Sequence, residues 1–213
     1  MAKPALVTPR KNPRQSRSQA TVDAILDACA RVLVDEGYDS ATTNRIASLA
    51  GVSVGSLYQY FPNKDAIVGA LLERHEVSML AHLGKMAADL ADAPIEDAIR
   101  TYVEAMLAIH AAEPKLHRAL TAGIARHGFE RMLAFQSRAE SVVRMYLEHH
   151  RARLKPKNLE LAAFLLVTST EAITHIAVLD RPDVLRDPAF AAEVTALVTS
   201  YLVKPKAKKR TRP

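Results

Sequence analysis

The sequence predicts an all-α protein, and three observations lead to this fold class. The chain has 213 residues, of which only 7 are glycine and none is tryptophan, and alanine and leucine are abundant, which favours helix over sheet. Apolar residues recur at steps of three and four along most of the chain, the spacing of one helix face. Residues typical of helix ends separate these segments. About nine helices and no strand are expected.

Composition excludes several classes of protein. The single cysteine, Cys29, excludes a disulfide framework within the chain, and its place on an apolar stripe predicts a packed core thiol. The longest strictly apolar run, Leu161–Val167, is far shorter than the ~18 residues of a membrane helix. The first residues lack the apolar core of a signal peptide. We therefore expect a cytoplasmic protein with no membrane contact, and no cofactor or metal is expected from the sequence.

The basic charge is concentrated at the two ends of the chain. The net charge is +6, yet eleven basic residues lie in the first 20 and last 10 residues, so the stretch between them is net negative. The ends are therefore predicted to be a basic arm over residues 1–14 and a basic tail over residues 204–213. Such segments suit contact with a polyanion, most often nucleic acid. For the tail, a solvated segment that aids solubility is an equal alternative.

The N-terminal third predicts three helices in a recognisable arrangement. Thr21–Tyr38 carries a single apolar stripe and ends at Gly37, where a left-handed residue suits a helix end. Two short helices are predicted on either side of a tight turn at Gly51: one is capped by Thr42 or Thr43 and runs to about Ala50, and the other is Val54–Phe61. Two short helices joined in this way are typical of a helix-turn-helix.

The stretch TTNRIASLAGVSVGSLYQYFPNK, from Thr42 to Lys64, resembles the DNA-binding signature of TetR-family transcriptional regulators. The Ile46-Ala47 pair, the Ala50–Ser53 turn, Leu57-Tyr58, Phe61 and Lys64 fall at the family's spacing. Leu33 departs from the pattern, since the family usually has phenylalanine there, but the exchange conserves a core residue. The resemblance covers about residues 15–75 and implies a DNA-binding domain over that range.

The same resemblance implies roles for individual residues. Five residues would face the major groove, where Gln59 could pair with adenine, Val54 could meet a thymine methyl, and Gly55 would permit close approach. Three others would clamp phosphates, which fixes register without reading sequence, and for Tyr58 core packing is the alternative. Asn44 could reach a base or a phosphate. The groove set is Val54, Gly55, Ser56, Gln59 and Tyr60; the phosphate set is Thr43, Tyr58 and Lys64; the arm adds Arg10, Lys11, Arg14 and Arg17.

The remainder of the chain predicts a helical regulatory and dimerisation domain over residues 76–203. Asn158–Asp180 differs from the other segments because part of it is apolar on all sides, which predicts burial nearly all round. A break is expected between Gly123 and Gly128. The predicted helices are Lys64–Leu83, Pro94–His110, a short one opened by Glu113-Pro114, Phe129–Arg153, Asn158–Asp180 and Pro188–Val203.

Glu171 and His175 lie four residues apart on one face of this apolar helix. Buried polar groups need partners, so the pair is either a structural hydrogen bond or dimer contact, or a polar handle in a ligand cavity between helices. In the second case the ligand would be largely apolar and neutral or cationic. The other expected cavity residues are Tyr102, Met106, Phe135, Phe164 and Leu166.

By resemblance, the last two helices form a homodimer interface, with Leu165, Val178 and Leu197 as apolar candidates. The expected function is that of a transcriptional regulator, in the first instance a repressor that binds a palindromic operator in double-stranded DNA and is released by a small molecule. Two alternatives remain at this point. One is the same fold without a small-molecule inducer, and the other is a helical enzyme, for which the sequence shows no catalytic constellation.

Overall fold

The computed structural model describes residues 16–112, 114–127 and 129–205. Within these residues the chain forms α-helices and two short 3₁₀ helices, with a single antiparallel bridge between Leu154 and Val203 as the one β-type contact. The all-α prediction is therefore confirmed. The helices group into two compact units, drawn from Met1–Met79 with Glu113–Leu133, and from Leu80–Ala112 with Ala134–Pro213.

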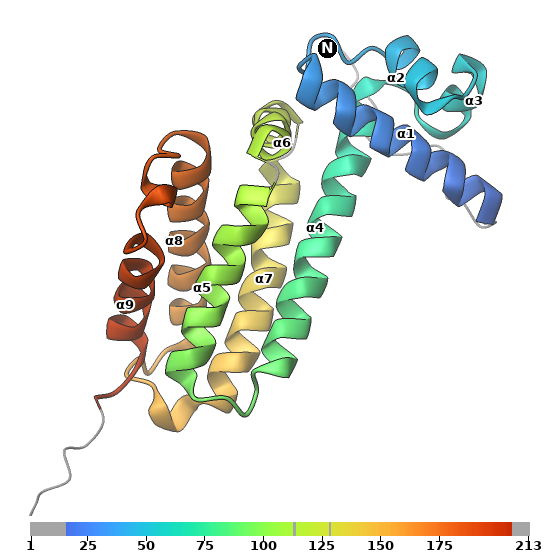
Figure 1. Ribbon diagram of the computed structural model, residues 1–213. Helices are drawn as coiled ribbons and strands as arrows, with labels where there is room; N and C mark the ends of the chain where they lie inside the picture. The colour runs from blue at the N-terminus through green and yellow to red at the C-terminus, as the bar shows by residue number, and fades with distance from the viewer. Residues whose placement is uncertain (1–15, 113, 128, 206–213) are drawn as a thin grey trace, which may run out of the picture. The chain divides into compact units, whose positions relative to one another are not determined.

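The first unit contains α1 to α3, the first part of α4, and α6. Helix α1 packs against α2 and also against α6. The core of the first unit includes Ile25, Ile46, Leu57 and Phe61, all with almost no solvent exposure, and α6 adds the buried side chain of Leu120. The helices are α1 (Ser16–Asp35), α2 (Thr43–Ala50), α3 (Val54–Tyr60), α4 (Lys64–Asp89) and α6 (Pro114–His127) (Figure 1).

The turn between α2 and α3 is built by local hydrogen bonds. Thr42 caps α2 by accepting from the Arg45 amide at 3.1 Å, and Ser53 caps α3 by accepting from the Ser56 amide at 3.0 Å. Gly51 lies between them with φ of +68°, a left-handed conformation that side-chain-bearing residues avoid. The Val52 amide donates to the Ala47 carbonyl at 3.1 Å, which completes a Schellman-type helix end.

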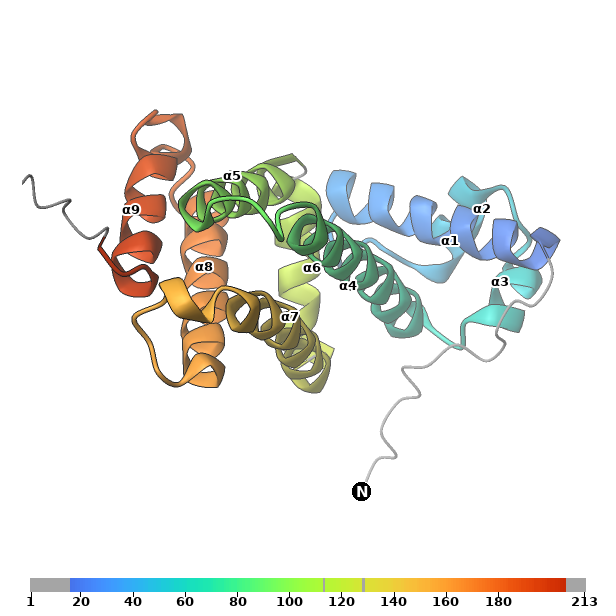
Figure 2. The ribbon, with the colours of Figure 1, turned by 90° about the horizontal axis from the view of Figure 1, so that it is seen from below.

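The second unit contains the end of α4, α5 and most of α7, together with α8 and α9. Helix α5 packs against both α8 and α9, and those two helices lie side by side in both views (Figures 1 and 2). A core of mainly aliphatic side chains joins them, including Ile99, Leu166 and Leu202. The elements are α5 (Ile95–Ala112), α7 (Phe129–His149), η1 (Arg151–Arg153), α8 (Leu159–Leu179), η2 (Val184–Arg186) and α9 (Phe190–Leu202).

Helix α8 is long and apolar enough to cross a membrane by length and composition, with a mean hydropathy of 1.6 over its best window. However, 44% of that window is buried inside the protein, as in the core helix of a globular unit. The expectation of burial nearly all round is wrong for the single chain. Leu161, Phe164, Leu165 and Ile176 are exposed on the face that points away from the buried side chains.

Several helix ends differ from the expectation, and α1 runs from Ser16 to Asp35 rather than from Thr21 to Tyr38. Helix α4 continues to Asp89, and α7 ends at His149, before a short 3₁₀ turn. Helix α6 runs through Gly123 to His127, because one glycine costs an otherwise continuous helix only about 1 kcal/mol. The expected boundary near residue 75 also differs from the two compact units, since α6 groups with the helices of the first unit.

Candidate functional site

Helix α3 combines a buried anchor with an exposed outer surface. Leu57 is fully buried in the core of the first unit, which fixes the rotation of this seven-residue helix. Val54, Gly55 and Gln59 are all exposed on it. A Cβ added at Gly55 would meet only the Ser53 hydroxyl, at 3.9 Å, so nothing inside the protein requires glycine at this position. The exposed surface of α3 is thus free to approach another molecule closely.

Two residues of the expected groove set are engaged within the protein. The Ser56 hydroxyl lies 2.8 Å from the Ser53 hydroxyl that caps the helix, and Ser56 is half-buried. Tyr60 is also half-buried, packs against the core of the first unit, and has its hydroxyl 3.1 Å from that of Ser18 on α1. These hydrogen bonds join α3 to its cap and to α1. Sequence spacing could not reveal the hydrogen bond of Tyr60, since Ser18 lies 42 residues away.

Thr43 and Tyr58 form the part of the site that joins α2 and α3. Their hydroxyl oxygens lie 3.2 Å apart, and Tyr58 is 41% exposed. Such exposure rules out the alternative reading of Tyr58 as a packed core residue. Asn44, in the first turn of α2, is exposed as well. The structure therefore gathers polar donors from both helices on the outside of the first unit.

Lys64 has a clear structural role at the start of α4. Its ammonium donates to the Tyr38 carbonyl at 3.0 Å and lies 4.2 Å from the centre of the Tyr38 ring. The Tyr38 hydroxyl in turn donates to the Asp65 carboxylate at 2.5 Å. The role of Tyr38 was missed from the sequence, because only the folded chain brings it to the base of α4. Removing Lys64 would therefore disturb the fold as well as any phosphate contact.

The expected arm lies largely outside the structural description. Arg10, Lys11 and Arg14 are not among the described residues, and Arg17 is described only by its place in the first turn of α1. Among the described acids of the first unit, Glu36 accepts from Arg45 at 2.6 Å and Asp27 pairs with Arg74 at 2.8 Å.

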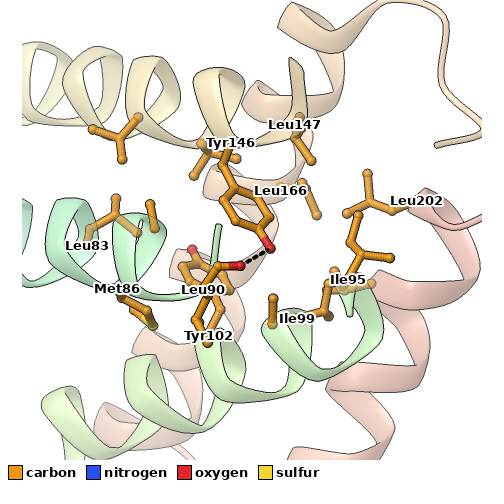
Figure 3. A pocket seen from close by; sticks show the side chains of 15 residues that line it. Leu83, Met86, Leu90, Ile95, Ile99, Tyr102, Tyr146, Leu147, Leu166 and Leu202 are labelled. Carbon is orange, nitrogen blue, oxygen red and sulfur yellow. Dashed lines mark hydrogen bonds between the residues drawn. The ribbon is translucent and has the colours of Figure 1, made fainter. Parts of the chain in front are cut away.

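The second unit contains an apolar cavity of about 70 Å³ that is partly open to solvent. Its walls come from α4, α5, α7, α8 and α9, and apart from two tyrosines they are hydrocarbon or thioether side chains (Figure 3). The Tyr146 hydroxyl donates to the Leu90 carbonyl at 3.3 Å. The wall residues labelled in the close view are Leu83, Met86, Leu90, Ile95, Ile99, Tyr102, Tyr146, Leu147, Leu166 and Leu202.

Of the residues expected around a ligand, Tyr102 and Leu166 line this cavity. Met106 is buried and Phe135 is half-buried, but neither belongs to its wall. Phe164 is 43% exposed, because it lies two residues from Leu166 and therefore about 200° away around α8. Glu171 and His175 lie outside the cavity wall too. The expected constellation thus divides between a cavity and a separate polar cluster.

This polar cluster consists of Glu171, His175 and His110, the last a residue that the sequence did not single out. The Glu171 carboxylate lies 3.2 Å from His175 and 3.6 Å from His110. Burial alone would raise the pKa of Glu171, but hydrogen bonds and charge from both imidazoles outweigh burial and lower the pKa to about 2. Burial likewise opposes the charged form of His110, yet Glu171 raises the pKa of His110.

A tight turn between two short helices, an exposed second helix and a separate helical unit with a cavity define a helix-turn-helix transcription regulator. Comparison with known families agrees with this class. Residues 94–202, just over half of the chain, match the family model "Tetracyclin repressor-like, C-terminal domain", and residues 25–71 match "Bacterial regulatory proteins, tetR family". The chain belongs to the TetR family of bacterial regulatory proteins.

Three relatives share less than a third of their aligned residues with this chain. The nucleoid occlusion factor SlmA of Glaesserella parasuis is 29% identical over 122 residues, 57% of each chain. The uncharacterized regulator YwcC of Bacillus subtilis is 29% identical over 104 residues, 49% of this chain and 44% of its own. The chain thus spans about half the length of these curated relatives. SmeT, repressor of the Stenotrophomonas maltophilia multidrug efflux pump SmeDEF, shares the fold, with a TM-score of 0.69, 22% identity, and coverage of 92% of this chain and 98% of SmeT.

Proposed function

We propose that the protein is a transcriptional repressor that binds a palindromic DNA operator as a homodimer and lies in the cytoplasm with the chromosome. The observation that carries the proposal is helix α3, which is anchored by fully buried Leu57 and leaves Val54, Gly55 and Gln59 exposed. A major groove admits one helix, and side chains near its N-terminal end read the base edges.

Base reading and phosphate contact fall to different residues in this proposal. Gln59 is exposed and reads a base, while Tyr58 and Thr43 place hydroxyl groups toward the backbone of the DNA. Asn44 and the basic arm add to the second group. Ser56, Tyr60 and Lys64 contribute mainly by holding α3 and the start of α4 in place.

Selection of binding sites from a random DNA library tests the proposal. The wild-type chain should enrich a palindrome whose half-sites are about 34 Å apart, or a multiple of that spacing. Gln59→Ala should lose base preference at one position of each half-site, at a cost of ~1–3 kcal/mol. Tyr58→Phe, which keeps the ring, should weaken all sequences alike. Failure of the wild type to enrich any sequence would refute operator binding.

The proposed dimer interface is the exposed apolar surface of α8 and α9. Leu165 and Leu197 remain candidates because both are exposed, whereas Val178 is buried inside the protomer and cannot meet a partner. Soluble monomers rarely leave such an extended apolar surface open to water. The other exposed residues of this surface are Leu161, Phe164, Ile176 and Tyr201.

Leu197→Glu tests this interface. Leu197 is 59% exposed, so its full burial by a partner stabilises the dimer by about 1–2 kcal/mol per copy, and the two copies of a symmetric dimer double that figure. Sedimentation at micromolar concentration should show a dimer for the wild type and a monomer for the variant. Ala192→Glu, at an exposed position about 140° away around the same helix, is the control and should remain dimeric. A monomeric wild type would refute the dimer.

The cavity of the second unit is the proposed ligand site. Its almost entirely hydrocarbon walls favour a largely apolar, uncharged molecule. A structure of this fold was solved as a SmeT–triclosan complex, which is a precedent for a small molecule on the fold. Leu166→Phe should fill the cavity and abolish the thermal shift that an apolar inducer, found by screening, causes in the wild type. If no compound shifts the wild type, the same fold without an inducer becomes the better description.

A further inference from the structure

His110, Glu171 and His175 bring three metal-binding side chains together inside the second unit. Glu171 and His175 are one turn apart on α8, and His110 reaches them from the last turns of α5, which packs against α8. The His110 side chain is 1% exposed, Glu171 is 23% exposed and His175 is 34% exposed. The cluster is therefore largely enclosed, with an opening at His175 through which a small ion could enter.

The geometry of the cluster matches the spacing of ligands around one metal ion. The two Nε2 atoms of His110 and His175 lie 3.6 Å and 3.2 Å from the same Glu171 oxygen. Bonds of ~2.0–2.1 Å at tetrahedral angles place neighbouring ligand atoms about 3.3 Å apart, between these two distances. The ligand nitrogens of His110 and His175 lie within 4.8 Å of each other, so a modest rotation of the partly exposed His175 ring would close the set.

The tautomer of His110 gives an independent argument. Its Nδ1 lies 2.8 Å from the Met106 carbonyl oxygen, which can only accept, so Nδ1 carries a hydrogen and donates it. In the neutral ring Nε2 then presents a lone pair to the negatively charged oxygen of Glu171. Two acceptors face each other stably only when a positive charge lies between them, either a proton or a metal ion. A histidine whose other nitrogen donates to a backbone carbonyl is also the usual arrangement of a metal-binding imidazole.

The negative charge of Glu171 is balanced by the two imidazoles. The groups that stabilise the Glu171 carboxylate are His110 and His175, with no lysine or arginine of the described residues among them. Imidazole and carboxylate together suit Zn²⁺ and similar first-row divalent ions.

We propose that His110, Glu171 and His175 bind a divalent transition-metal ion such as Zn²⁺. The two imidazoles bind through Nε2 and the carboxylate through the oxygen that they share. The ion takes the place that a proton on His110 would otherwise fill. The test of this site does not depend on the proposed DNA binding, because metal binding is measured on the full chain without DNA.

Zn²⁺ titration of the metal-free full chain by calorimetry is the first test, with Co²⁺ as a spectroscopic probe. The wild type should bind one Zn²⁺ per chain, and Co²⁺ should give the intense visible absorption of a tetrahedral site. Glu171→Gln and His175→Gln should each weaken Zn²⁺ binding at least tenfold. His82→Gln, an exposed histidine elsewhere in the second unit, is the matched control and should bind like the wild type.

A replacement that keeps a metal ligand separates coordination from simple charge balance. His175→Cys should retain Zn²⁺ and give a thiolate-to-cobalt charge-transfer band, and circular dichroism should show wild-type helix content for every variant. Because His175 is partly exposed, its variants should fold even if Glu171→Gln does not. A wild type that binds no Zn²⁺, or His175→Gln binding as tightly as the wild type, would overturn the proposal and leave a proton between His110 and Glu171.

Discussion

Two glycines of the helix-turn-helix, Gly51 and Gly55, should respond in opposite ways to the same substitution. Gly51 has a φ of +68° and open space where a Cβ would stand, so Gly51→Ala adds backbone strain without a clash. The left-handed conformation costs ~1–2 kcal/mol for a residue with a side chain, and the stiffer unfolded chain offsets ~0.4–1 kcal/mol of that cost. We expect a net loss of about 1 kcal/mol in the free energy of unfolding.

Gly55 lies inside α3, where glycine is less favourable than alanine by roughly 0.5–1 kcal/mol. The nearest atom to an added Cβ is 3.9 Å away, so Gly55→Ala should stabilise the fold by up to that amount. The same methyl group would stand on the surface proposed to enter the DNA groove. Operator affinity should therefore fall at least about tenfold, which corresponds to ~1.4 kcal/mol.

Urea unfolding followed by circular dichroism measures the first quantity, and fluorescence anisotropy with the selected operator measures the second. Compared with the wild type, Gly51→Ala should be less stable. Gly55→Ala should be more stable and yet bind the operator more weakly. If Gly55→Ala binds the operator as well as the wild type, close approach of α3 to the DNA is refuted. If Gly51→Ala is as stable as the wild type, the account of the turn fails.

Three further predictions concern the first unit. Ser53→Ala removes the cap of α3 and should lower the free energy of unfolding by ~1 kcal/mol in urea, a result that unchanged stability would contradict. Leu57→Ala should cost ~2–5 kcal/mol in the same assay, since the side chain is fully buried, and a loss below about 1 kcal/mol would show that α3 is not anchored there. Burial raises the pKa of the Cys29 thiol to about 12, so the unfolded chain ionises first as pH rises. Stability relative to Cys29→Ala should thus be fully present below about pH 9 and fall by about 1.4 kcal/mol per pH unit between pH 9 and 12, and a flat difference would contradict a buried neutral thiol.

The helix-turn-helix could be predicted from the sequence because its signals are local. Thr42 and Ser53 cap the helices that directly follow them, and Gly51 supplies the left-handed residue between. All of these hydrogen bonds join residues within five positions of one another. The position of Cys29 in the core was predictable for a similar reason, since one apolar stripe on α1 marks its buried face.

The second unit was less predictable because its features depend on which helix faces meet. Helix α8 is apolar on both sides, so the sequence could not show that Leu166 faces the cavity while Phe164 faces outward. Tyr146 was missed for the same reason, although it lies on the apolar stripe of α7. The partnership of His110 with Glu171 joins residues 61 positions apart, and no periodicity signals such a contact.

The chain enters or leaves the first unit at three points, after Met79, near Glu113 and after Leu133. The first and last of these points fall inside the unbroken helices α4 and α7. The DNA-binding module is therefore a discontinuous domain, and a fragment that stops after α4 would leave the apolar surface that Leu120 covers exposed to water.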